Sequence, residues 1–419
     1  MFIYIVQPGD SLYTISVKYD IPIDRIRLAN GLVRINIVPG QALLIPLSIY
    51  KVQPGDSIYT IAQMAYVPLQ ALINANPSIR PNALYPGMKI TIPNISDFYI
   101  TTLGYYALRS PELDRALVND FAPYATFISL FEFHFSADGS LNVLDDTAAI
   151  QTAWSRRVNP LATITNLTQT GFSTDLTHQV LNNPDARNTL IENIYTIVST
   201  KGYAGVNIDF ERVSAEDRDL FSGFLRRLKE RLQPEGYWLT IAVPAKTSDD
   251  IPWLLGYDYG AIGSVVDLMF IMTYDWHHGT SEAGPVAPIN EVRRTIDYAL
   301  QYVRRDKLLI GLPFYGYNWI VPYQPGSVAQ ALSNQNAVDL AMRYQVPIQY
   351  SQQYKSPFFE YVDENGLRHV VWFEDSRSIS EKMLLIREYL LEGLGAWQLT
   401  LGFPEGPWLL TKFFRVKRV

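Results

Sequence analysis

Cysteine is absent from this chain of 419 residues, which excludes disulfide bonds, thiolate metal ligands and a cysteine nucleophile. No run approaches the roughly 18 apolar residues that a membrane-spanning helix needs. Basic charge is also scarce, because 35 Lys and Arg face 41 Asp and Glu, for a net charge of -6 with no long basic run. These absences leave a nucleic-acid partner without electrostatic support and predict no membrane partner.

Two further signals are missing. The opening residues MFIYIVQPGDS contain neither a basic n-region nor a long apolar h-region, so we expect synthesis in the cytoplasm without a signal peptide. The five His show no metal-ligand spacing such as H-E-x-x-H, and no phosphate-binding loop is present. We therefore expect no metal and no nucleotide cofactor.

The composition is that of a large globular protein. Hydrophobic residues make up 48% and charged residues 18%, and the length predicts two or three structural units. Aromatic residues reach 13%, with 27 Tyr and 8 Trp. These aromatics indicate either a large core or stacking surfaces for a ligand.

A repeat occupies the first hundred residues. VQPGDSLYTIS at 6–16 returns as VQPGDSIYTIA at 52–62, and the close PGQALLIP at 39–46 returns as PGMKITIP at 86–93. Each copy predicts the order strand, helix, helix, strand, with Asp10 or Ser11 capping the first helix. We expect two small βααβ modules, over 1–48 and 49–95. For the first module the expected elements are a strand over Phe2–Val6, helices over Leu12–Ser16 and Ile23–Ala29, and a strand over Ala42–Ile45.

Both copies resemble the LysM module. That resemblance implies binding of glycans that contain N-acetylglucosamine, through the loop after the first strand and the loop before the last. The glycan-binding residues it implies are Gly9, Asp10, Ser11, Gly55, Asp56 and Ser57. The alternative for the Asp and Ser side chains is that they only cap helices.

From about Phe98 onwards, strand and helix patterns alternate, which is typical of βαβ units with a parallel sheet. Eight strands over 98–419 predict an α/β TIM (β/α)8 barrel, with a doubly wound open sheet as the alternative. The stretch 320–375 is too long for a simple connection. Its segments 358–362 and 367–373 flank DENG, so we expect a small α+β lobe with a hairpin turn at Asn365-Gly366. The eight expected strands are Ile100–Tyr106, Ala125–Phe133, Ala162–Asn166, Gly205–Glu211, Trp238–Val243, Leu268–Tyr274, Leu308–Phe314 and Gly395–Leu399.

The fourth expected strand, GVNIDFE, alternates apolar and polar residues. In a barrel strand one face packs on the helices and the other points inward, so Asn207, Asp209 and Glu211 should face inward, with Glu211 nearest the mouth. Two carboxylates close together in a partly dry site raise each other's pKa, and such a pair can supply a general acid. Both approach from one side, so a nucleophile has to come from elsewhere. A buried structural network is the alternative.

Three motifs resemble those of glycoside hydrolase family 18. They are AGVNIDFE at 204–211 on the fourth strand, MTYD at 272–275 on the sixth, and Trp397 on the eighth. The resemblance implies a substrate-assisted mechanism, in which the 2-acetamido oxygen of the sugar attacks C1. Glu211 would protonate the leaving oxygen, Asp209 would orient the acetamido group, and Tyr274 would donate a hydrogen bond to it.

The same resemblance implies further sugar contacts. Trp397 would form a floor for the sugar ring, although a barrel core also accepts a Trp. For Tyr274 and Asp275 the alternative is a core tyrosine followed by a helix cap. Asn207 stands where the family has an aspartate, and we expect it to hold Asp209 by a hydrogen bond. The substrate-binding candidates are Asn207, Met272, Asp275, Trp397, Tyr315, Asn318 and Asn166.

Two LysM modules in front of a family 18 barrel are similar to the spore enzymes of endospore-forming bacteria that cut cortex peptidoglycan during germination. This resemblance implies an N-acetylglucosaminidase that acts on β-1,4 bonds after N-acetylglucosamine in peptidoglycan strands, its expected partner. It implies deposition at the coat and cortex boundary of the spore. The alternatives are a chitinase and a non-catalytic glycan-binding protein of the spore coat.

Overall fold

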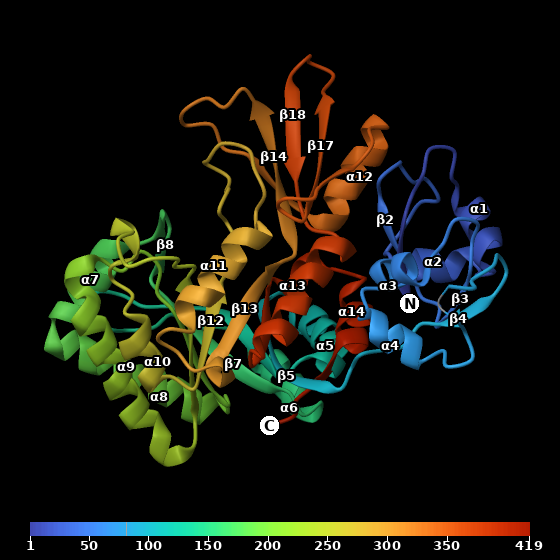
Figure 1. The fold of residues 1–419 in the computed structure, drawn as a ribbon. Helices are drawn as coiled ribbons and strands as arrows, with labels where there is room; N and C mark the ends of the chain where they lie inside the picture. The colour runs from blue at the N-terminus through green and yellow to red at the C-terminus, as the bar shows by residue number, and fades with distance from the viewer. Residues whose placement is uncertain (81) are drawn as a thin grey trace.

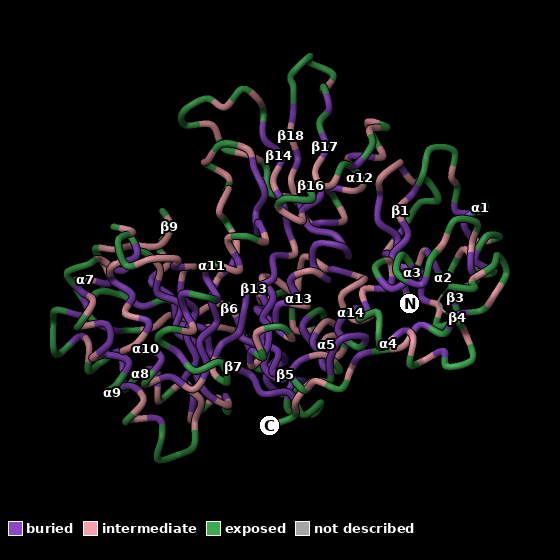
Figure 2. Tube along the Cα trace, in the orientation of Figure 1, coloured by how far each residue is buried: buried purple, intermediate pink, exposed green. Residues whose placement is uncertain are grey.

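The computed structural model describes residues 1–80 and 82–419 and has three parts (Figure 1). Two small modules at the N-terminus lie beside a barrel, and a lobe rises above the barrel. Figure 2 shows the barrel strands almost continuously buried, whereas the tips of the lobe are exposed. Within the described residues, no helix has both the length and the apolar character needed to cross a bilayer.

The modules have the strand, helix, helix, strand order expected from the repeat. In each one the first strand pairs antiparallel with the last. Ser11 and Ser57 are the helix N-caps, and each forms a capping box with the Thr three residues later. The first module consists of β1 (Phe2–Ile5), α1 (Leu12–Tyr19), α2 (Ile23–Ala29) and β2 (Ala42–Ile45), and the second of β3 (Ile49–Lys51), α3 (Ile58–Met64), α4 (Leu69–Asn74) and β4 (Lys89–Thr91).

An aromatic cluster joins the two modules. The ring of Phe2 packs edge-on against Tyr50 of the second module at a centroid distance of 5.0 Å, and against Tyr19 at 4.9 Å. The rings of Tyr19 and Tyr50 are 5.9 Å apart. Each module is too small to bury much apolar surface alone, so sharing a core stabilises both.

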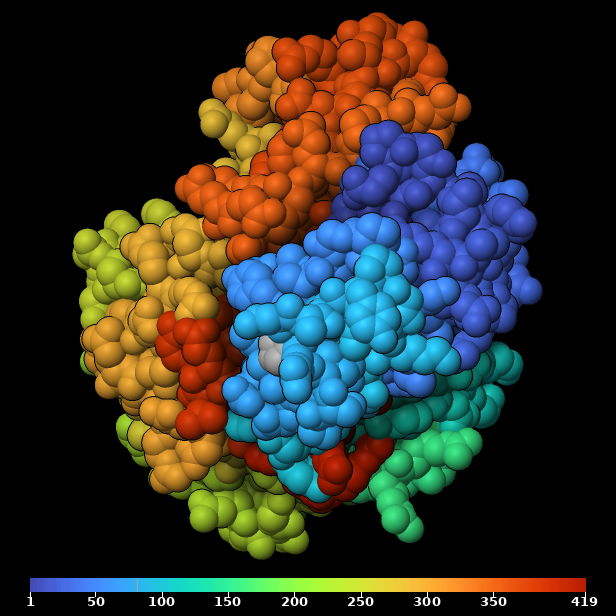
Figure 3. Space-filling view, turned by 45° about the vertical axis from the view of Figure 1, so that its right-hand side comes forward, coloured from blue at the N-terminus to red at the C-terminus, as the bar shows by residue number. Residues whose placement is uncertain are grey.

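The modules also contact the rest of the chain, as Figure 3 shows for the lobe. The Ile348 amide donates to the Pro39 carbonyl oxygen at 2.9 Å, and the Arg377 guanidinium donates to the Gly40 carbonyl oxygen at 3.2 Å. At the other end, Lys412 Nζ donates to the Met1 carbonyl oxygen at 3.1 Å. The two modules and the rest of the chain therefore form one packed unit.

The barrel consists of eight parallel strands in one closed sheet. The order is β19-β13-β12-β11-β10-β7-β6-β5, and β5 pairs again with β19, so the sheet has no open edge. Closure excludes the doubly wound alternative, and each strand matches one of the eight predicted. The strands are β5 (Phe98–Ala107), β6 (Phe127–His134), β7 (Asn159–Thr165), β10 (Gly205–Asp209), β11 (Trp238–Pro244), β12 (Leu268–Met272), β13 (Leu308–Pro313) and β19 (Gly393–Trp397); a ninth, β20 (Phe414–Val416), pairs with the start of β5.

Helices surround this sheet on its outer face (Figure 1). They are α5 (Pro111–Phe121), α6 (Thr147–Ser155), α7 (Thr174–Asn182), α8 (Pro184–Lys201), α9 (Arg218–Leu232), α10 (Tyr259–Val265), α11 (Ile289–Ala299), α13 (Ser376–Tyr389) and α14 (Gly406–Phe413). Short 3-10 turns are η1 (Ala122–Tyr124), η2 (Ala215–Asp217), η3 (Gln233–Glu235), η4 (Pro252–Leu254), η5 (Arg305–Lys307) and η6 (Leu399–Leu401), and a small hairpin, β8 (Leu167–Thr168) and β9 (Gly171–Phe172), follows β7.

Strand β10 has the expected two faces. The ring of Phe210 stacks on Phe221 and Phe224 of α9 at 5.7 and 5.6 Å, whereas Asn207 and Asp209 face the barrel interior. The strand ends at Asp209, two residues earlier than predicted. Glu211 therefore lies on the segment that leaves the barrel mouth.

The lobe contains an antiparallel five-stranded sheet in the order β15-β14-β18-β17-β16. It begins at Tyr315, earlier than the predicted 320, because the chain turns directly from β13 into the first lobe strand. The hairpin at 363–367 has only Gly366 at positive φ, 78°, so it is a three-residue loop rather than a two-residue turn. The lobe elements are β14 (Tyr315–Val321), β15 (Gln330–Ser333), α12 (Asn334–Tyr344), β16 (Gln349–Ser351), β17 (Ser356–Val362) and β18 (Arg368–Trp372).

The closing motif of each module supplies a matched pair of variants. Gly40 and Gly87 both have positive φ, 80° and 90°, but a Cβ on Gly40 would lie 1.8 Å from the Ile348 carbonyl oxygen, whereas a Cβ on Gly87 meets nothing within 4 Å. We expect Gly87→Ala to cost about 1 kcal/mol of backbone strain. Gly40→Ala should cost at least about 2 kcal/mol more, because the module must move off the lobe.

Denaturant unfolding of the full chain measures the free energy of unfolding of each variant. Equal losses for Gly40→Ala and Gly87→Ala would contradict the close contact between the first module and the lobe.

Candidate active site

A cavity of about 1100 Å³ opens at the carboxyl ends of the barrel strands. This is the end where barrel strands deliver functional side chains to the solvent. Asp209, Glu211, Met272, Tyr274 and Trp397 all line it. Other lining residues are Tyr105 and Phe131 at the floor, Leu167 and Phe172 from the small hairpin, and Trp253, Asp275, Trp276 and His278 from the loops.

Asp209 and Glu211 are the central carboxylates of the cavity. Asp209 is 4% exposed, and its Oδ1 has no hydrogen-bond partner among the described residues. Burial raises the pKa of Asp209 well above its usual value, and the charges of Glu211 and Glu132 add to the effect. Burial also raises the pKa of Glu211 to about 7, with a further contribution from Asp275 and an opposing one from Arg212. Glu211 can therefore hold or release a proton near neutral pH.

Asn207 forms no hydrogen bond with Asp209, so that prediction is wrong. Its amide donates to Tyr105 Oη at 3.0 Å and accepts from Thr240 Oγ1 at 2.8 Å. Thr240 is the residue that pairs with Asn207 across the two strands. Neighbouring strands lie about 4.8 Å apart, whereas residues i and i+2 of one strand are about 6.6 Å apart, so the cross-strand partner is nearer. Asn207 is fully buried below the cavity, so it is no sugar contact.

Asn166 holds the backbone of Glu211 through two hydrogen bonds. The Asn166 amide donates to the Glu211 carbonyl oxygen at 2.7 Å, and its Oδ1 accepts from the Glu211 amide at 2.9 Å. Tyr257 Oη adds a hydrogen bond to the Phe210 carbonyl oxygen at 2.8 Å. Asn166 is fully buried, so the prediction that it contacts sugar is wrong. It positions the segment that carries Glu211.

Tyr274 and Asp275 follow β12 and lie side by side at the cavity. Asp275 Oδ1 accepts from Tyr315 Oη at 2.8 Å and from Tyr317 Oη at 3.2 Å, and its φ is +61°. The helix-cap alternative for Asp275 is wrong, because α11 begins only at Ile289. A left-handed conformation at a non-glycine residue costs free energy and is enriched at functional sites.

Two of the other predicted contacts lie away from the cavity surface. Tyr315 is buried and supports Asp275 rather than lining the cavity. Asn318 lies inside the lobe, where its amide donates to Tyr361 Oη at 2.9 Å and its Oδ1 is 3.0 Å from His369 Nδ1. The prediction of a sugar contact fails for Asn318 because the first lobe strand carries it out of the barrel mouth.

Trp397 lies at the floor of the cavity. Its ring packs edge-on against Phe131 at a centroid distance of 4.9 Å and against Tyr105 at 5.5 Å. Neighbouring aromatic edges hold the indole in place while part of it stays open to the cavity. Such an arrangement can present a flat apolar face to a sugar ring.

In the modules, the predicted glycan-binding side chains are engaged locally. The Asp10 carboxylate accepts from Tyr4 Oη at 2.6 Å and from the backbone N–H of Gln7 at 2.7 Å. The Asp56 carboxylate accepts from Tyr50 Oη and from the backbone N–H of Gln53, each at 2.7 Å. Ser11 and Ser57 cap helices. Gly9 and Gly55 lie at positive φ with open space around them. The side chains of Asp and Ser shape the loops, and contact of these loops with a glycan stays a prediction.

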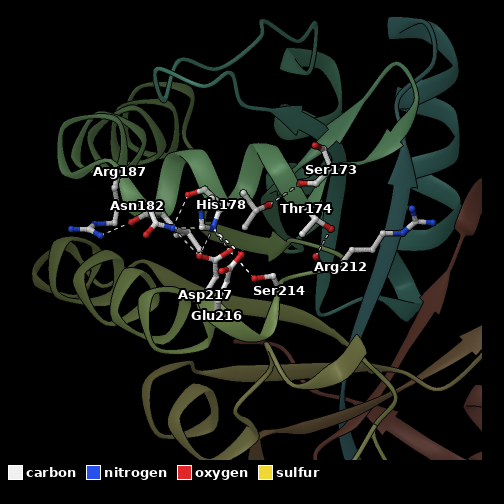
Figure 4. A network of polar contacts seen from close by, with 11 residues as sticks. Ser173, Thr174, His178, Asn182, Arg187, Arg212, Ser214, Glu216 and Asp217 are labelled. Carbon is white, nitrogen blue, oxygen red and sulfur yellow. Dashed lines mark hydrogen bonds and ion pairs between the residues drawn. The ribbon is translucent and has the colours of Figure 1, made fainter. Parts of the chain in front are cut away.

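A second polar cluster holds the loop that follows Glu211 (Figure 4). His178 Nδ1 lies 3.0 Å from Asp217 Oδ1 and 3.6 Å from Glu216 Oε1, and these ligand-type atoms fall within 4.8 Å of one another. The Asp217 carboxylate also accepts from Asn182 at 2.8 Å and from Ser214 at 3.1 Å. Protein donors already satisfy this carboxylate, so we assign the cluster to fixing the loop against α7. Sequence spacing did not reveal it, because His178 and Asp217 lie on separate elements.

Other residues of the site were also missed by sequence reasoning. Tyr105 and Thr240 fix Asn207, Tyr257 supports the backbone before Glu211, and Trp253 and Arg212 line the rim of the cavity. Tyr105 could have been found from its place near the end of the first predicted strand. The other four depend on which elements meet in space.

Comparisons with known proteins identify both parts of the chain. The profile for glycosyl hydrolases family 18 matches residues 166–402, and the LysM domain profile matches 4–46 and 50–93. The chain is 63% identical over 420 residues to the "Putative sporulation-specific glycosylase YdhD" of Bacillus subtilis (strain 168), covering 100% of both chains. It is 37% identical to the cortical fragment-lytic enzyme of Bacillus anthracis, over 99% of this chain and 98% of that one.

Among solved structures, the fold is similar to that of the Bacillus cereus spore cortex-lytic enzyme SleL. The TM-score is 0.88 at 34% sequence identity, with 99% of each chain covered.

Asn166 offers a test of the backbone clamp. Asn166→Ala removes both hydrogen bonds to the Glu211 backbone and leaves buried groups unpaired, so it should lower the free energy of unfolding by about 3 kcal/mol. Asn193→Ala is the control. Among the described residues, the side-chain amide of Asn193 donates only to the Gly139 carbonyl oxygen, at 2.9 Å, so its loss should cost about 1 kcal/mol. Denaturant unfolding measures both. A loss at Asn166 no larger than that at Asn193 would contradict the clamp.

Proposed function

The chain belongs to glycosyl hydrolase family 18, and from that premise we propose that it is an N-acetylglucosaminidase of spore cortex peptidoglycan. It would hydrolyse the β-1,4 bond after N-acetylglucosamine and act in the spore during germination. The observation that carries the proposal is Glu211, a carboxyl with a pKa of about 7 that lines the cavity beside buried Asp209. The two LysM matches support a peptidoglycan substrate, as do the names of the spore relatives.

Glu211 acts as the general acid in this proposal. Its carboxyl proton passes to the glycosidic oxygen as the bond between that oxygen and C1 of N-acetylglucosamine breaks. The carbonyl oxygen of the sugar's own 2-acetamido group forms the new bond to C1, which gives a cyclic oxazolinium ion. Water, deprotonated by Glu211, then attacks C1 and restores the acetamido group with retained configuration.

Asp209 and Tyr274 serve the acetamido group. Asp209 Oδ1 has no hydrogen-bond partner among the described residues, so it is available to accept from the acetamido N–H and to stabilise the developing positive charge. The Tyr274 hydroxyl donates to the acetamido oxygen and orients it towards C1. Trp397, with Met272 beside it on the cavity wall, lies under the same sugar ring.

Asn207 changes how the Asp209 carboxyl can exchange a proton. An aspartate there could exchange a proton with Asp209, but an amide held by Tyr105 and Thr240 cannot. Of the two charged groups that raise the pKa of Asp209, Glu211 has the larger effect. We infer that Asp209 and Glu211 titrate as one coupled pair.

The sugar at the reducing end of the digestion products distinguishes the proposed function from its alternatives. Digestion of purified cortex peptidoglycan by the full chain should release fragments whose reducing end is N-acetylglucosamine, which mass spectrometry identifies. Glu211→Gln is the matched control, because it keeps the shape of the site but removes the acid, so it should release no fragments and still bind the peptidoglycan.

Three outcomes would contradict the proposal. Muramic acid at the reducing end would indicate a muramidase, and cleavage of chitin oligomers without cleavage of peptidoglycan would indicate a chitinase. Binding without any cleavage would indicate a glycan-binding protein.

The pKa of Glu211 predicts the pH dependence. The acid must be protonated when substrate binds, so kcat/KM should fall as the pH rises above about 7. Above its pKa the protonated fraction falls roughly tenfold per pH unit. A dinitrophenyl glycoside is the control, because its leaving group needs no protonation and its kcat/KM should not share this fall. Parallel alkaline profiles for both substrates would contradict the role of Glu211.

A further inference from the structure

Glu132, on β6, is a carboxyl that the proposed mechanism does not use. Its side chain is 19% exposed, and its Oε2 is buried with no hydrogen-bond partner among residues 1–80 and 82–419. His134 Nδ1 lies 3.9 Å from Glu132 Oε1, which is beyond hydrogen-bond distance. Burial raises the pKa of Glu132, and the positive charge of His134 opposes that rise. A buried carboxylate oxygen without a partner costs free energy, so it indicates a functional role.

A bulge in β6 directs Glu132 into the barrel. The register of β6 on β7 shifts between Leu130 and Phe133, so two residues of β6 oppose one of β7. Phe131 lines the cavity, whereas Phe133 faces the helices and packs on Tyr203. Glu132 is the extra residue between them, and a bulge of this kind re-aims a side chain beside an active site.

The bulge also sets the level of Glu132 in the barrel. Thr163 of β7, which lies opposite the bulge, pairs on its other side with Asn207 of β10. Two strand spacings of about 4.8 Å separate the two backbones, and a glutamate side chain spans much of that distance. Thr163 between them is short, and its Oγ1 is 2.7 Å from Ser129 Oγ. Asn207 stands where the family motif has an aspartate, so β6 supplies a carboxyl at the level where β10 lacks one.

Asp209 is the group on which the charge of Glu132 acts. Burial raises the pKa of Asp209 well above its usual value, and the charges of Glu211 and Glu132 raise it further. Two phenols also face Asp209, Tyr105 from β5 and Tyr274 after β12. Burial raises the pKa of both phenols well above the usual value, so they are neutral. Asp209 is therefore subject to two negative charges, one from its own segment and one from β6.

We propose that Glu132 is a positioning residue, whose carboxylate keeps one proton on the pair formed by Asp209 and Glu211 in the free enzyme. This inference rests on the proposed function, because that proton is the one that Glu211 passes to the leaving oxygen. Loss of the proton leaves two negative charges in the pair, and a third carboxylate nearby repels them. Asn207 carries no charge, so it cannot supply this repulsion, and Glu132 supplies it from β6.

The test removes the charge of Glu132 and keeps its shape. Glu132→Gln should lower the pKa of the pair, so the alkaline limb of kcat/KM on oligosaccharides from purified cortex should move to lower pH. We expect a shift of roughly half a pH unit or more, which lowers kcat/KM about threefold or more on the alkaline side. Well below pH 7 the pair is protonated in both proteins, so kcat/KM should keep its wild-type value there.

Two further variants separate charge from packing. Glu132→Asp keeps the charge and should keep the wild-type alkaline limb. Glu112→Gln is the matched control, because it removes the same charge from an exposed position of α5 and should not move the limb. Glu132→Gln replaces an unpaired carboxylate by a neutral amide, so denaturant unfolding should show no loss of stability. A variant that does not fold, or one that loses kcat/KM equally at every pH, would indicate a structural role and contradict the inference.

The outcomes also separate this inference from the proposed function. If the wild type releases fragments ending in N-acetylglucosamine and Glu132→Gln leaves the alkaline limb unmoved, the inference is wrong and the proposed function stands. The same holds if Glu132→Asp moves the limb as far as Glu132→Gln does. If the wild type releases no such fragments, the proposed function and the inference both fail.

Discussion

The site depends on a backbone contact between two strand ends. Asn166, at the end of β7, holds both the amide and the carbonyl oxygen of Glu211, which lies just beyond β10. A segment that has left the sheet has no ladder to fix it, and a buried side-chain amide with correct geometry replaces the missing ladder. The position of the Glu211 carboxyl therefore depends on a neighbouring strand, and the parallel register of β7 and β10 brings Asn166 and Glu211 together.

Glu211 is surrounded by hydrogen bonds that fix its backbone and by charges that act on its carboxyl. Tyr257, Thr174 and the His178 to Asp217 cluster hold residues 210–217 from both sides. Burial and the charge of Asp275 raise the pKa of Glu211, and solvent-facing Arg212 lowers it. Burial raises the pKa of a carboxyl and a nearby cation lowers it, so a value near neutrality results from a balance of the two.

The two modules are packed against the rest of the chain and do not hang from it as separate units. The first module contacts Ile348 of the lobe and Arg377 of α13, and the two modules share an aromatic core. In a flexible arrangement, a binding module only raises the local concentration of substrate. In this packed arrangement the modules also hold a fixed direction relative to the cavity.

Sequence alone determined the elements and the chemistry that is local to them. The repeat, the eight strands and the alternation in GVNIDFE follow from short-range periodicity, because residues two apart on a strand share a face. Periodicity could not identify partners across strands. Asn207 was assigned to Asp209 but bonds to Tyr105 and Thr240, and Asn166 was assigned to sugar but holds Glu211. Asn318 leaves with the lobe, whose first strand begins where no motif marked it. Only the closed barrel decided these contacts, because a hydrogen bond depends on the distance between atoms in space and the sequence records only their order along the chain.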